Sequence, residues 1–318
     1  MKTRIILSIL VVLALGQATL SAFDQPVVHQ VQSKDHIVIF GDSTTAGGGW
    51  PAGYVQLLIQ ALNEQVPGTK VSAICRNSRT TDSLLGPKGW ILGDFEKLRQ
   101  IEPVPTIAII VLGLNDSKSR AAGVEPYARK LREAVGLLRE RKQTVILTTP
   151  TMWNGFDQTK PYAEAARTLA AELKCPFIDL YAAYADHITK NMKDGKVLPG
   201  TQLFDTEEPV IGLHLGVLGN TLSARTILQG LGLKPEWKQY QLRLTVKGKG
   251  QIKADPAPSG DKGREAYAPG TKVTLTFTPE AGAKFTRWFN FEGTVKETVE
   301  KLTVTMDRPM WIIAETTP

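Results

Sequence analysis

Three short fragments carry side chains that together could cleave an ester. They read Gly-Asp-Ser at residues 41–43, Gly-Leu-Asn-Asp at 113–116 and Gly-Leu-His at 212–214. Ester cleavage through a covalent intermediate needs a hydroxyl nucleophile, a base that takes its proton, and fixed donors for the oxyanion. Ser43, His214 and Asn115 supply one of each. The chain therefore holds the groups for serine-dependent hydrolysis, provided that the fold brings them together.

The surrounding sequence predicts the elements that must position these groups. Continuous apolar runs at 37–40, 71–75, 107–112, 145–147 and 177–180 are typical of parallel strands covered on both faces. Amphipathic stretches lie between them, and one places Tyr127, Leu131, Val135 and Leu138 on a single helical face. Alternating strands and helices predict a flavodoxin-like three-layer α/β/α domain with a parallel sheet of order 2-1-3-4-5.

Ser43 and Asn115 each follow a predicted strand. Ser43 comes directly after the first strand, and Asn115 follows the third strand after a Gly-Leu turn. Ligands bind at the carboxyl ends of strands in such sheets, so both side chains are expected at one edge. The alternatives are that Ser43 only caps a helix and that Asn115 only stabilises a turn. Asp116 is expected to support the loop.

The fragments resemble the sequence blocks of the GDSL, or SGNH, hydrolases, whose named residues are a Ser, a Gly, an Asn and a His. The resemblance implies that Ser43 is the nucleophile and His214 the general base. It also implies that the N–H groups of Ser43 and Ser78, with Asn115, form the oxyanion hole. Ser78 stands where the family has its glycine, so it must adopt backbone angles that Gly reaches freely.

A second departure concerns the acid that orients the histidine in the family. That Asp precedes the His by three positions, and Ile211 stands there in this chain. Asp205, Glu207, Glu208 or a backbone carbonyl could hold the imidazole instead. His29, His36 and His187 lack the setting before a last helix that His214 has. These departures also leave open a binding protein that keeps the hydrolase fold without turnover.

The first 22 residues predict a secretory signal peptide, because two basic residues precede a short apolar run and then small residues. The run is too short to span a membrane. We therefore expect a secreted, periplasmic or cell-surface protein with no integral membrane segment after cleavage. Without Lys2 and Arg4 the net charge falls from +7 to +5. No basic stripe with interleaved aromatics is present, so nucleic acid is not an expected partner.

Cys75 and Cys175 are the two cysteines of the chain. Each lies in or beside an apolar run, and these runs are the second and fifth predicted strands, at opposite edges of the expected sheet. Strands are about 4.8 Å apart, so the two sulfur atoms would be far beyond bridging distance. The sequence therefore predicts two buried free thiols.

Beyond residue 240 the pattern changes to alternating apolar and polar residues, which predicts half-exposed antiparallel strands. The stretches 267–275 and 282–288 resemble the divergent B-repeat modules of bacterial surface proteins. The predicted organisation is a signal peptide at 1–22, a hydrolase domain at 23–235 and a small all-β module at 241–318. No catalytic fragment follows His214, so the module is expected to be dispensable for turnover of a small ester.

The function predicted from these residues is that of a secreted serine esterase. By association with a surface-type module, its substrate is expected to be an acetylated polysaccharide. The alternatives are a lipolytic esterase or lysophospholipase, and a catalytically weak surface-binding protein. No metal or organic cofactor is expected, because no ligand cluster has metal spacing. Trp153, after the fourth strand, is expected either at the pocket mouth or beneath the next helix.

Overall fold

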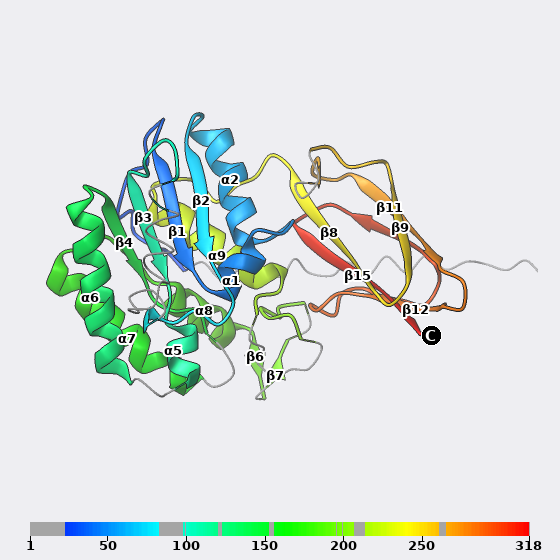
Figure 1. The fold of residues 1–318 in the computed structure, drawn as a ribbon. Helices are drawn as coiled ribbons and strands as arrows, with labels where there is room; N and C mark the ends of the chain where they lie inside the picture. The colour runs from blue at the N-terminus through cyan, green and yellow to red at the C-terminus, as the bar shows by residue number, and fades with distance from the viewer. Residues whose placement is uncertain are drawn as a thin grey trace, which may run out of the picture.

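The structure is a computed structural model that describes residues 23–82, 98, 100–119, 123–152, 156–194, 196–198, 200–206, 214–260 and 265–317. Figure 1 shows an α/β region at left, running from β1 to α9, and an all-β region at right, running from β8 to β15. Trp153, Glu207, Glu208 and Ile211 lie outside the described residues, as does the expected signal peptide. In the described part of the chain, no helix is long and apolar enough to cross a membrane.

A five-stranded parallel sheet forms the centre of the α/β region, in the predicted order β2-β1-β3-β4-β5. Its strands are β1 (His36–Gly41), β2 (Lys70–Cys75), β3 (Ile107–Val111), β4 (Thr144–Thr148) and β5 (Phe177–Ile178). The last strand ends two residues earlier than predicted. The reason is that the Asp179 side chain accepts a hydrogen bond from the N–H of Ala182 and so begins the next helix.

Helices cover both faces of this sheet. They are α1 (Ser43–Gly48), α2 (Tyr54–Gln65), α5 (Leu114–Ser119), α6 (Val124–Glu140), α7 (Phe156–Leu173), α8 (Leu180–Lys190) and α9 (Val217–Gly230). Ile37 and Ile39 pack with α2, α8 and α9, whereas Val38 and Phe40 pack with α6 and α7. Successive strand residues face opposite sides, which is why a continuous apolar run serves two cores. The predicted three-layer architecture is confirmed.

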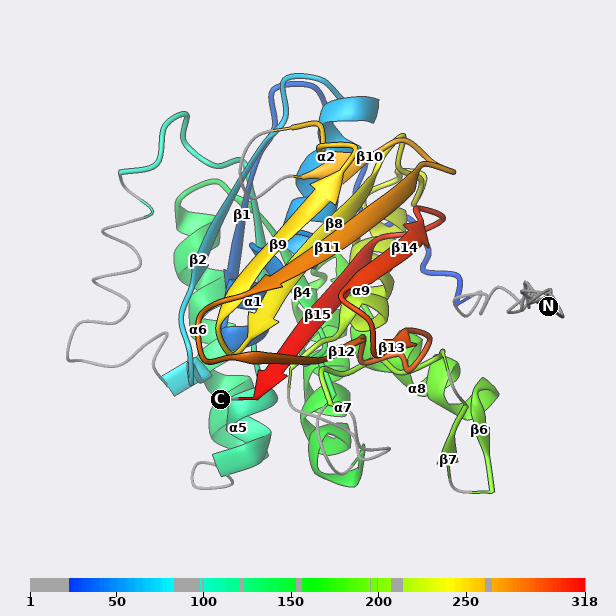
Figure 2. The same cartoon turned by 90° about the vertical axis from the view of Figure 1, so that its right-hand side faces the viewer.

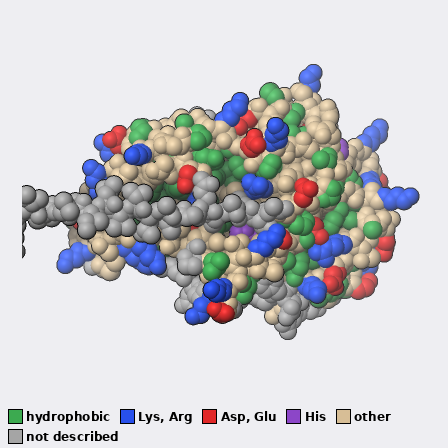
Figure 3. Space-filling view, turned by 180° about the vertical axis from the view of Figure 1, so that it is seen from behind, with side chains coloured by type: hydrophobic (Ala, Val, Ile, Leu, Met, Phe, Trp, Pro, Cys, Tyr) green, Lys and Arg blue, Asp and Glu red, His purple; other side chains and the backbone are tan. Residues whose placement is uncertain are grey.

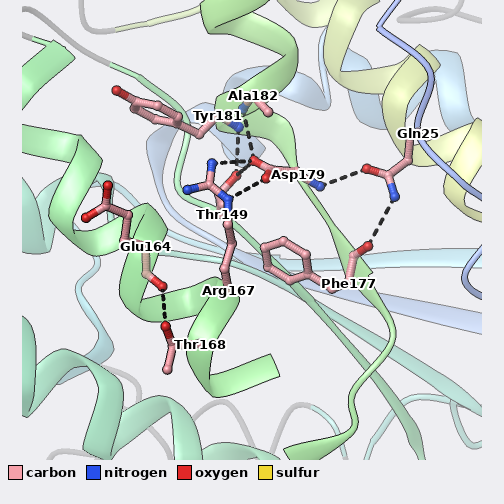
Figure 4. A network of polar contacts seen from close by, with 9 residues as sticks. All are labelled: Gln25, Thr149, Glu164, Arg167, Thr168, Phe177, Asp179, Tyr181 and Ala182. Carbon is pink, nitrogen blue, oxygen red and sulfur yellow. Dashed lines mark hydrogen bonds and ion pairs between the residues drawn. The ribbon is translucent and has the colours of Figure 1, made fainter. Parts of the chain in front are cut away.

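A polar network fixes the carboxyl end of β5 (Figure 4). Arg167 of α7 donates to the Asp179 carboxylate over 2.6 Å, and the Asp179 N–H donates to Gln25 over 2.9 Å. The Gln25 amide donates in turn to the Phe177 carbonyl over 3.1 Å. The amino-terminal segment, α7 and α8 are thereby tied together at the sheet edge where ligands bind in such folds.

Cys75 ends the edge strand β2, Cys175 lies two residues before the opposite edge strand β5, and the two form no disulfide. Cys175 is buried, as predicted. Cys75 is only half-buried, because it ends β2, an edge strand that is largely open to solvent. The prediction of two buried thiols is therefore correct for one of them.

The all-β region consists of two sheets packed face to face, with orders β10-β8-β15-β12-β13 and β14-β11-β9. Its strands are β8 (Tyr240–Lys247), β9 (Gly250–Asp255), β10 (Ala266–Tyr267), β11 (Lys272–Pro279), β12 (Lys284–Phe289), β13 (Lys296–Glu297), β14 (Lys301–Thr305) and β15 (Met310–Thr317). A separate hairpin, β6 (Met192–Lys193) with β7 (Lys196–Val197), belongs to the α/β region. Trp288 lies fully buried in the core between the two sheets.

One pairing departs from the antiparallel prediction: β15 runs parallel to β8. The strand β15 is also buried on both faces rather than half-exposed. Ile312 and Ala314 enter the core of the all-β region, while Trp311 and Ile313 pack against Ala52 and Val217 of the α/β region. Alternation in the sequence identifies the two faces of a strand but does not reveal that a neighbouring region covers the second one.

Figures 1 and 2 together place the sheet containing β8 and β15 against the α/β region, with β9 and β11 on the outer side. The Ala52 N–H donates to the Gln241 side chain over 2.7 Å, and the Trp237 indole donates to the Leu57 carbonyl over 2.8 Å. The second bond holds the connecting segment along α2. On the face seen in Figure 3, basic and acidic side chains are interspersed and form no large patch of one charge.

Candidate active site

Ser43 is the first residue of α1, directly after the end of β1. The helix is capped by Asp42, whose carboxylate accepts from the Thr44 N–H at 2.9 Å and from the Thr44 hydroxyl at 2.8 Å. A Cβ on Gly41 would lie 1.8 Å from the Thr45 hydroxyl oxygen, so this strand-to-helix turn requires glycine. Because Asp42 does the capping, the Ser43 hydroxyl is not needed for that purpose.

Burial raises the pKa of Asp42 to about 6, although the two hydrogen bonds from Thr44 act in the opposite direction. The carboxyl is 1 % exposed. Ionisation of Asp42 therefore lowers the stability of the folded state. Its carboxylate still has a structural role, because it caps α1 through the two bonds from Thr44.

His214 lies next to Ser43. Its Nε2 is 3.2 Å from the Ser43 Oγ, which is within hydrogen-bond distance. The local backbone explains this position: Phe204 and Leu215 form an isolated antiparallel bridge, and the Asp205 N–H donates to the His214 carbonyl over 3.1 Å. This short pairing holds the histidine at the start of α9.

The same pairing places Asp205 beside the imidazole. Its Oδ2 is 3.9 Å from the His214 Nδ1, beyond hydrogen-bond distance but close enough for a charge interaction. Such contacts are often long in unliganded enzymes and tighten when substrate binds. Burial raises the pKa of Asp205, and the neighbouring His214 partly offsets that rise. Of the three carboxylates that the sequence offers, Asp205 is the one that the described residues include.

Ser78 has a φ of +58°, in the left-handed region that glycine favours. A residue with a Cβ thus adopts here a conformation that glycine reaches freely. The segment that carries it is anchored beside the nucleophile, because the Arg76 N–H donates to the Gly41 carbonyl over 3.4 Å. Ser78 is exposed.

Asn115 donates one amide hydrogen to the Arg79 carbonyl over 3.0 Å, which ties it to the residue after Ser78. An amide carries two hydrogens, so a second remains for a bound oxyanion. The turn before it needs Gly113, whose φ is +123° and whose added Cβ would meet Pro150 at 2.6 Å. The structure thus joins the fragment at 113–116 to the segment that carries Ser78.

Asp116 supports this junction. Its carboxylate accepts from the Thr81 N–H at 3.1 Å and from the Thr81 hydroxyl at 2.5 Å. Burial raises the pKa of Asp116, and the bonds from Thr81 lower it. The expected structural role of Asp116 agrees with these contacts.

A cavity of about 400 Å³ opens at Ser43 and His214 and includes Asp205 and Asn77 in its wall. The opposite wall comes from the all-β region through Arg243 and Trp311, which the sequence prediction missed. The Arg243 guanidinium lies over the Trp50 ring at 3.8 Å and over the Trp311 ring at 3.5 Å. The alternation of Leu242 and Leu244 with Arg243 signals only that this side chain faces away from the module core.

The other described histidines lie in different settings. His36 is buried at the start of β1 and contacts the Ser72 hydroxyl at 2.8 Å. His187 is buried in α8 against the Thr201 carbonyl, and its burial lowers its pKa. Within the described ranges, no group of three or more His, Cys, Asp or Glu side chains is arranged to hold a metal ion.

Comparison with known proteins agrees with both parts of this architecture. The profile of the GDSL-like lipase/acylhydrolase family matches residues 39–222, and that of the divergent InlB B-repeat domain matches residues 240–315. None of the curated proteins gives a match.

Solved structures give the same fold. An acetylxylan esterase from Geobacillus stearothermophilus superposes with a TM-score of 0.52 at 20 % identity, covering 65 % of this chain and 98 % of that one. A protein described as a GDSL-like lipase, from Parabacteroides merdae, gives 0.51 at 17 % identity, covering 66 % and 100 %.

Proposed function

Because the chain belongs to the GDSL-like lipase/acylhydrolase family and is an SGNH-type serine hydrolase of acyl esters, we propose that Ser43 and His214 carry its chemistry and that its substrate is an acetylated carbohydrate. The single observation that carries the proposal is the 3.2 Å contact between the Ser43 Oγ and the His214 Nε2 at the floor of an open cavity.

In the proposed reaction, the Ser43 Oγ attacks the acyl carbonyl while the His214 Nε2 takes the hydroxyl proton. The resulting oxyanion accepts hydrogen bonds from the N–H groups of Ser43 and Ser78 and from the Asn115 amide. His214 then gives its proton to the departing alcohol. Water, activated by the same histidine, releases the acid and restores Ser43. Asp205 stabilises the imidazolium that forms in both halves of the cycle.

Support for these roles comes from the acetylxylan esterase, because catalytic mutants of that enzyme replace an Asp, a Ser or a His with Ala. Ser43 and His214 match the Ser and the His in type. The Asp of that enzyme precedes its His by three positions, where this chain has Ile211, so the role of Asp205 rests on its place 3.9 Å from the imidazole. The roles proposed for Ser78 and Asn115 in the oxyanion hole are supported by the left-handed backbone of Ser78 and by the bond from Asn115 to the Arg79 carbonyl.

The carbohydrate part of the proposal rests on the wall of the cavity. Trp50 offers a ring that is 54 % exposed, and Asp205 and Arg243 add charge. A long acyl chain would have to lie against these charged groups and remove water from them, which costs free energy. A short acyl group on a polar alcohol fits the lining better, so the lipolytic alternative is disfavoured.

We also propose that the enzyme works outside the cytoplasm, with the hydrolase domain at 23–235 and the module at 241–318. The match to a B-repeat domain supports export, since we expect such modules on bacterial surfaces. The shift from α/β elements to β strands after α9 supports the boundary.

A fluorophosphonate probe tests the chemistry directly. The full chain should form one adduct, on Ser43, and Ser43→Ala should abolish both the labelling and the hydrolysis of 4-nitrophenyl acetate. Loss of the triad serine in a serine protease of unrelated fold lowers kcat by about 10⁶. Ser33→Ala, on an exposed loop, serves as the matched control and should behave as the parent protein. An unlabelled Ser43 would favour the binding-protein alternative.

Substrate class is tested by comparing acetylated xylo-oligosaccharides with long-chain acyl glycerols. A higher kcat/KM for the acetylated sugars is expected. A preference for the acyl glycerols would overturn the carbohydrate part and leave the serine chemistry intact.

A further inference from the structure

A second cavity, of about 430 Å³, adjoins the catalytic one at the junction of the two regions. Trp50 and Arg243 line both cavities. The second one continues from these two side chains toward Thr245, Glu265 and Tyr267 of the all-β region. The two hollows therefore meet at the Trp50–Arg243 stack, and a ligand longer than one acylated unit could occupy both.

We propose that this second cavity is a saccharide-binding subsite, which holds the neutral polysaccharide backbone on the alcohol side of the ester. We call it the distal subsite and define it by Trp50, Arg243, Thr245, Glu265 and Tyr267. The inference rests on the proposed function, because it identifies the part of the substrate that extends beyond the acyl group.

The lining chemistry favours a sugar chain. A pyranose ring has apolar faces and a rim of hydroxyls, so its site needs a flat ring surface together with donors and acceptors. Trp50 provides an exposed indole whose orientation is fixed by Arg243 at 3.8 Å. The Glu265 carboxylate accepts hydrogen bonds, and the Thr245 hydroxyl can donate and accept. Ligand sites typically combine aromatic walls with a few polar groups in cavities of about 300–1,000 Å³.

Three further contacts show that the distal subsite is a built feature rather than a gap between loosely associated regions. The Trp311 indole donates to the Thr245 hydroxyl over 2.8 Å, and the Arg243 guanidinium lies over the Trp311 ring at 3.5 Å. The loop that bears Trp50 is fixed by the bond from Ala52 to Gln241. The aromatic and charged groups are therefore preorganised before a ligand arrives, which lowers the cost of binding.

The arrangement also explains the position of the all-β region. Trp50 comes from the loop after α1, Arg243 from β8 and Tyr267 from β10. Neither region alone contains the subsite. A module that shares the substrate cleft in this way would select for substrate length, since only a chain of several sugars would reach Tyr267.

The test uses the full chain carrying Ser43→Ala, so that binding is measured without turnover. Xylohexaose, cellohexaose and mannohexaose are titrated by calorimetry, and binding of at least one is expected. Ala254→Arg adds a long side chain on the β9 wall of the distal subsite and should weaken that binding at least tenfold. Gln251→Arg makes the same charge change at an exposed position of β9 and should leave it within twofold. Absence of binding to all three sugars would overturn the proposal.

Trp50→Ala provides a second variant that does not depend on repacking, because its ring is largely exposed. It should also weaken binding about tenfold, with melting temperatures checked for every variant. Unchanged binding in both Trp50→Ala and Ala254→Arg would overturn the distal subsite.

A kinetic measurement separates this inference from the proposed function. With Ser43 present, kcat/KM should rise with the number of sugars in the acetylated substrate, and Ala254→Arg should flatten that rise. Hydrolysis that shows no dependence on length would refute the distal subsite and leave the esterase standing. Sugar binding without any hydrolysis of acetyl esters would refute the esterase instead.

Discussion

The α/β region and the all-β region both contribute to the catalytic cavity, but they position their side chains differently. Ser43 and Asn115 stand on tight turns at strand ends, where glycines and a capping carboxylate fix the backbone locally. Arg243 and Trp311 stand within the regular strands β8 and β15, and they reach the cavity only because a whole sheet is docked there. Local turns leave a signature in the sequence, whereas a docked face does not.

The two regions also each supply a buried carboxylate to a helix start. Asp42 caps α1 from within the α/β region. Glu292, in the all-β region, accepts from the N–H groups of Val217 and Leu218 at the start of α9, where Gly216 has no side chain to offer. Unsatisfied N–H groups at a helix start need such partners. The all-β region thus stabilises the helix that directly follows His214.

The largest effect is expected from removing the carboxylate beside His214 in the α/β region. Asp205→Ala should lower kcat on 4-nitrophenyl acetate by about a thousandfold, because removal of the orienting acid in serine proteases with the same triad costs on the order of 10⁴-fold. The contact here is longer than a hydrogen bond, so a somewhat smaller loss is expected. Asp186→Ala, which removes a carboxylate paired with Lys190 on α8, is the matched control and should retain full activity.

The kcat of Ile211→Asp shows whether Asp205 replaces the family's acid. If Asp205 compensates for the family's absent acid, a carboxylate at residue 211 should give no gain. A hundredfold gain, with no loss in Asp205→Ala, would mean that the site is degraded and would favour the binding-protein alternative.

Sequence reasoning succeeded where the determinants were local. The strand order and the three layers follow from apolar runs that alternate with amphipathic helices, and the short β5 differs only because Asp179 caps α8. The parallel pairing of β15 with β8 could not be predicted, since alternation carries no information on strand direction. Asp205 was one of several candidates for the acid, and its place beside His214 depends on the backbone bridge from Phe204 to Leu215, which the sequence does not reveal.

The buried carboxyl of Asp42 should make stability depend on pH. Burial raises the pKa of this carboxyl from 3.8 to about 6, so the folded state binds a proton more tightly than the unfolded state. Stability should therefore fall as pH rises from about 4 to 6. Relative to wild type, Asp42→Asn should gain about 3 kcal/mol in unfolding free energy between pH 4 and 7.

Urea unfolding of both proteins at these two pH values measures the difference. Asp255→Asn, at an exposed position in the all-β region, is the control and should track wild type. A gap between Asp42→Asn and wild type that stays constant with pH would show that Asp42 is not a buried, costly charge.

The smallest expected effect tests the all-β region on a substrate too short to use the distal subsite. The sequence alone indicated that a chain ending at Lys238 would keep full activity on 4-nitrophenyl acetate, because no catalytic fragment follows His214. The structure argues for a loss of about tenfold. Truncation removes Arg243 and Trp311 from the cavity wall, exposes Val217 and removes the carboxylate at the start of α9.

Glu292→Gln in the full chain separates these causes. The amide keeps one acceptor for the N–H groups at the start of α9, removes a carboxylate whose pKa burial raises, and leaves Arg243 and Trp311 in the cavity wall. Turnover reduced only a few fold in this variant would assign most of the truncation's effect to the lost wall. If the truncated chain folds and turns over the small ester at the full rate, the two regions are independent for chemistry, and the all-β region acts only on longer substrates.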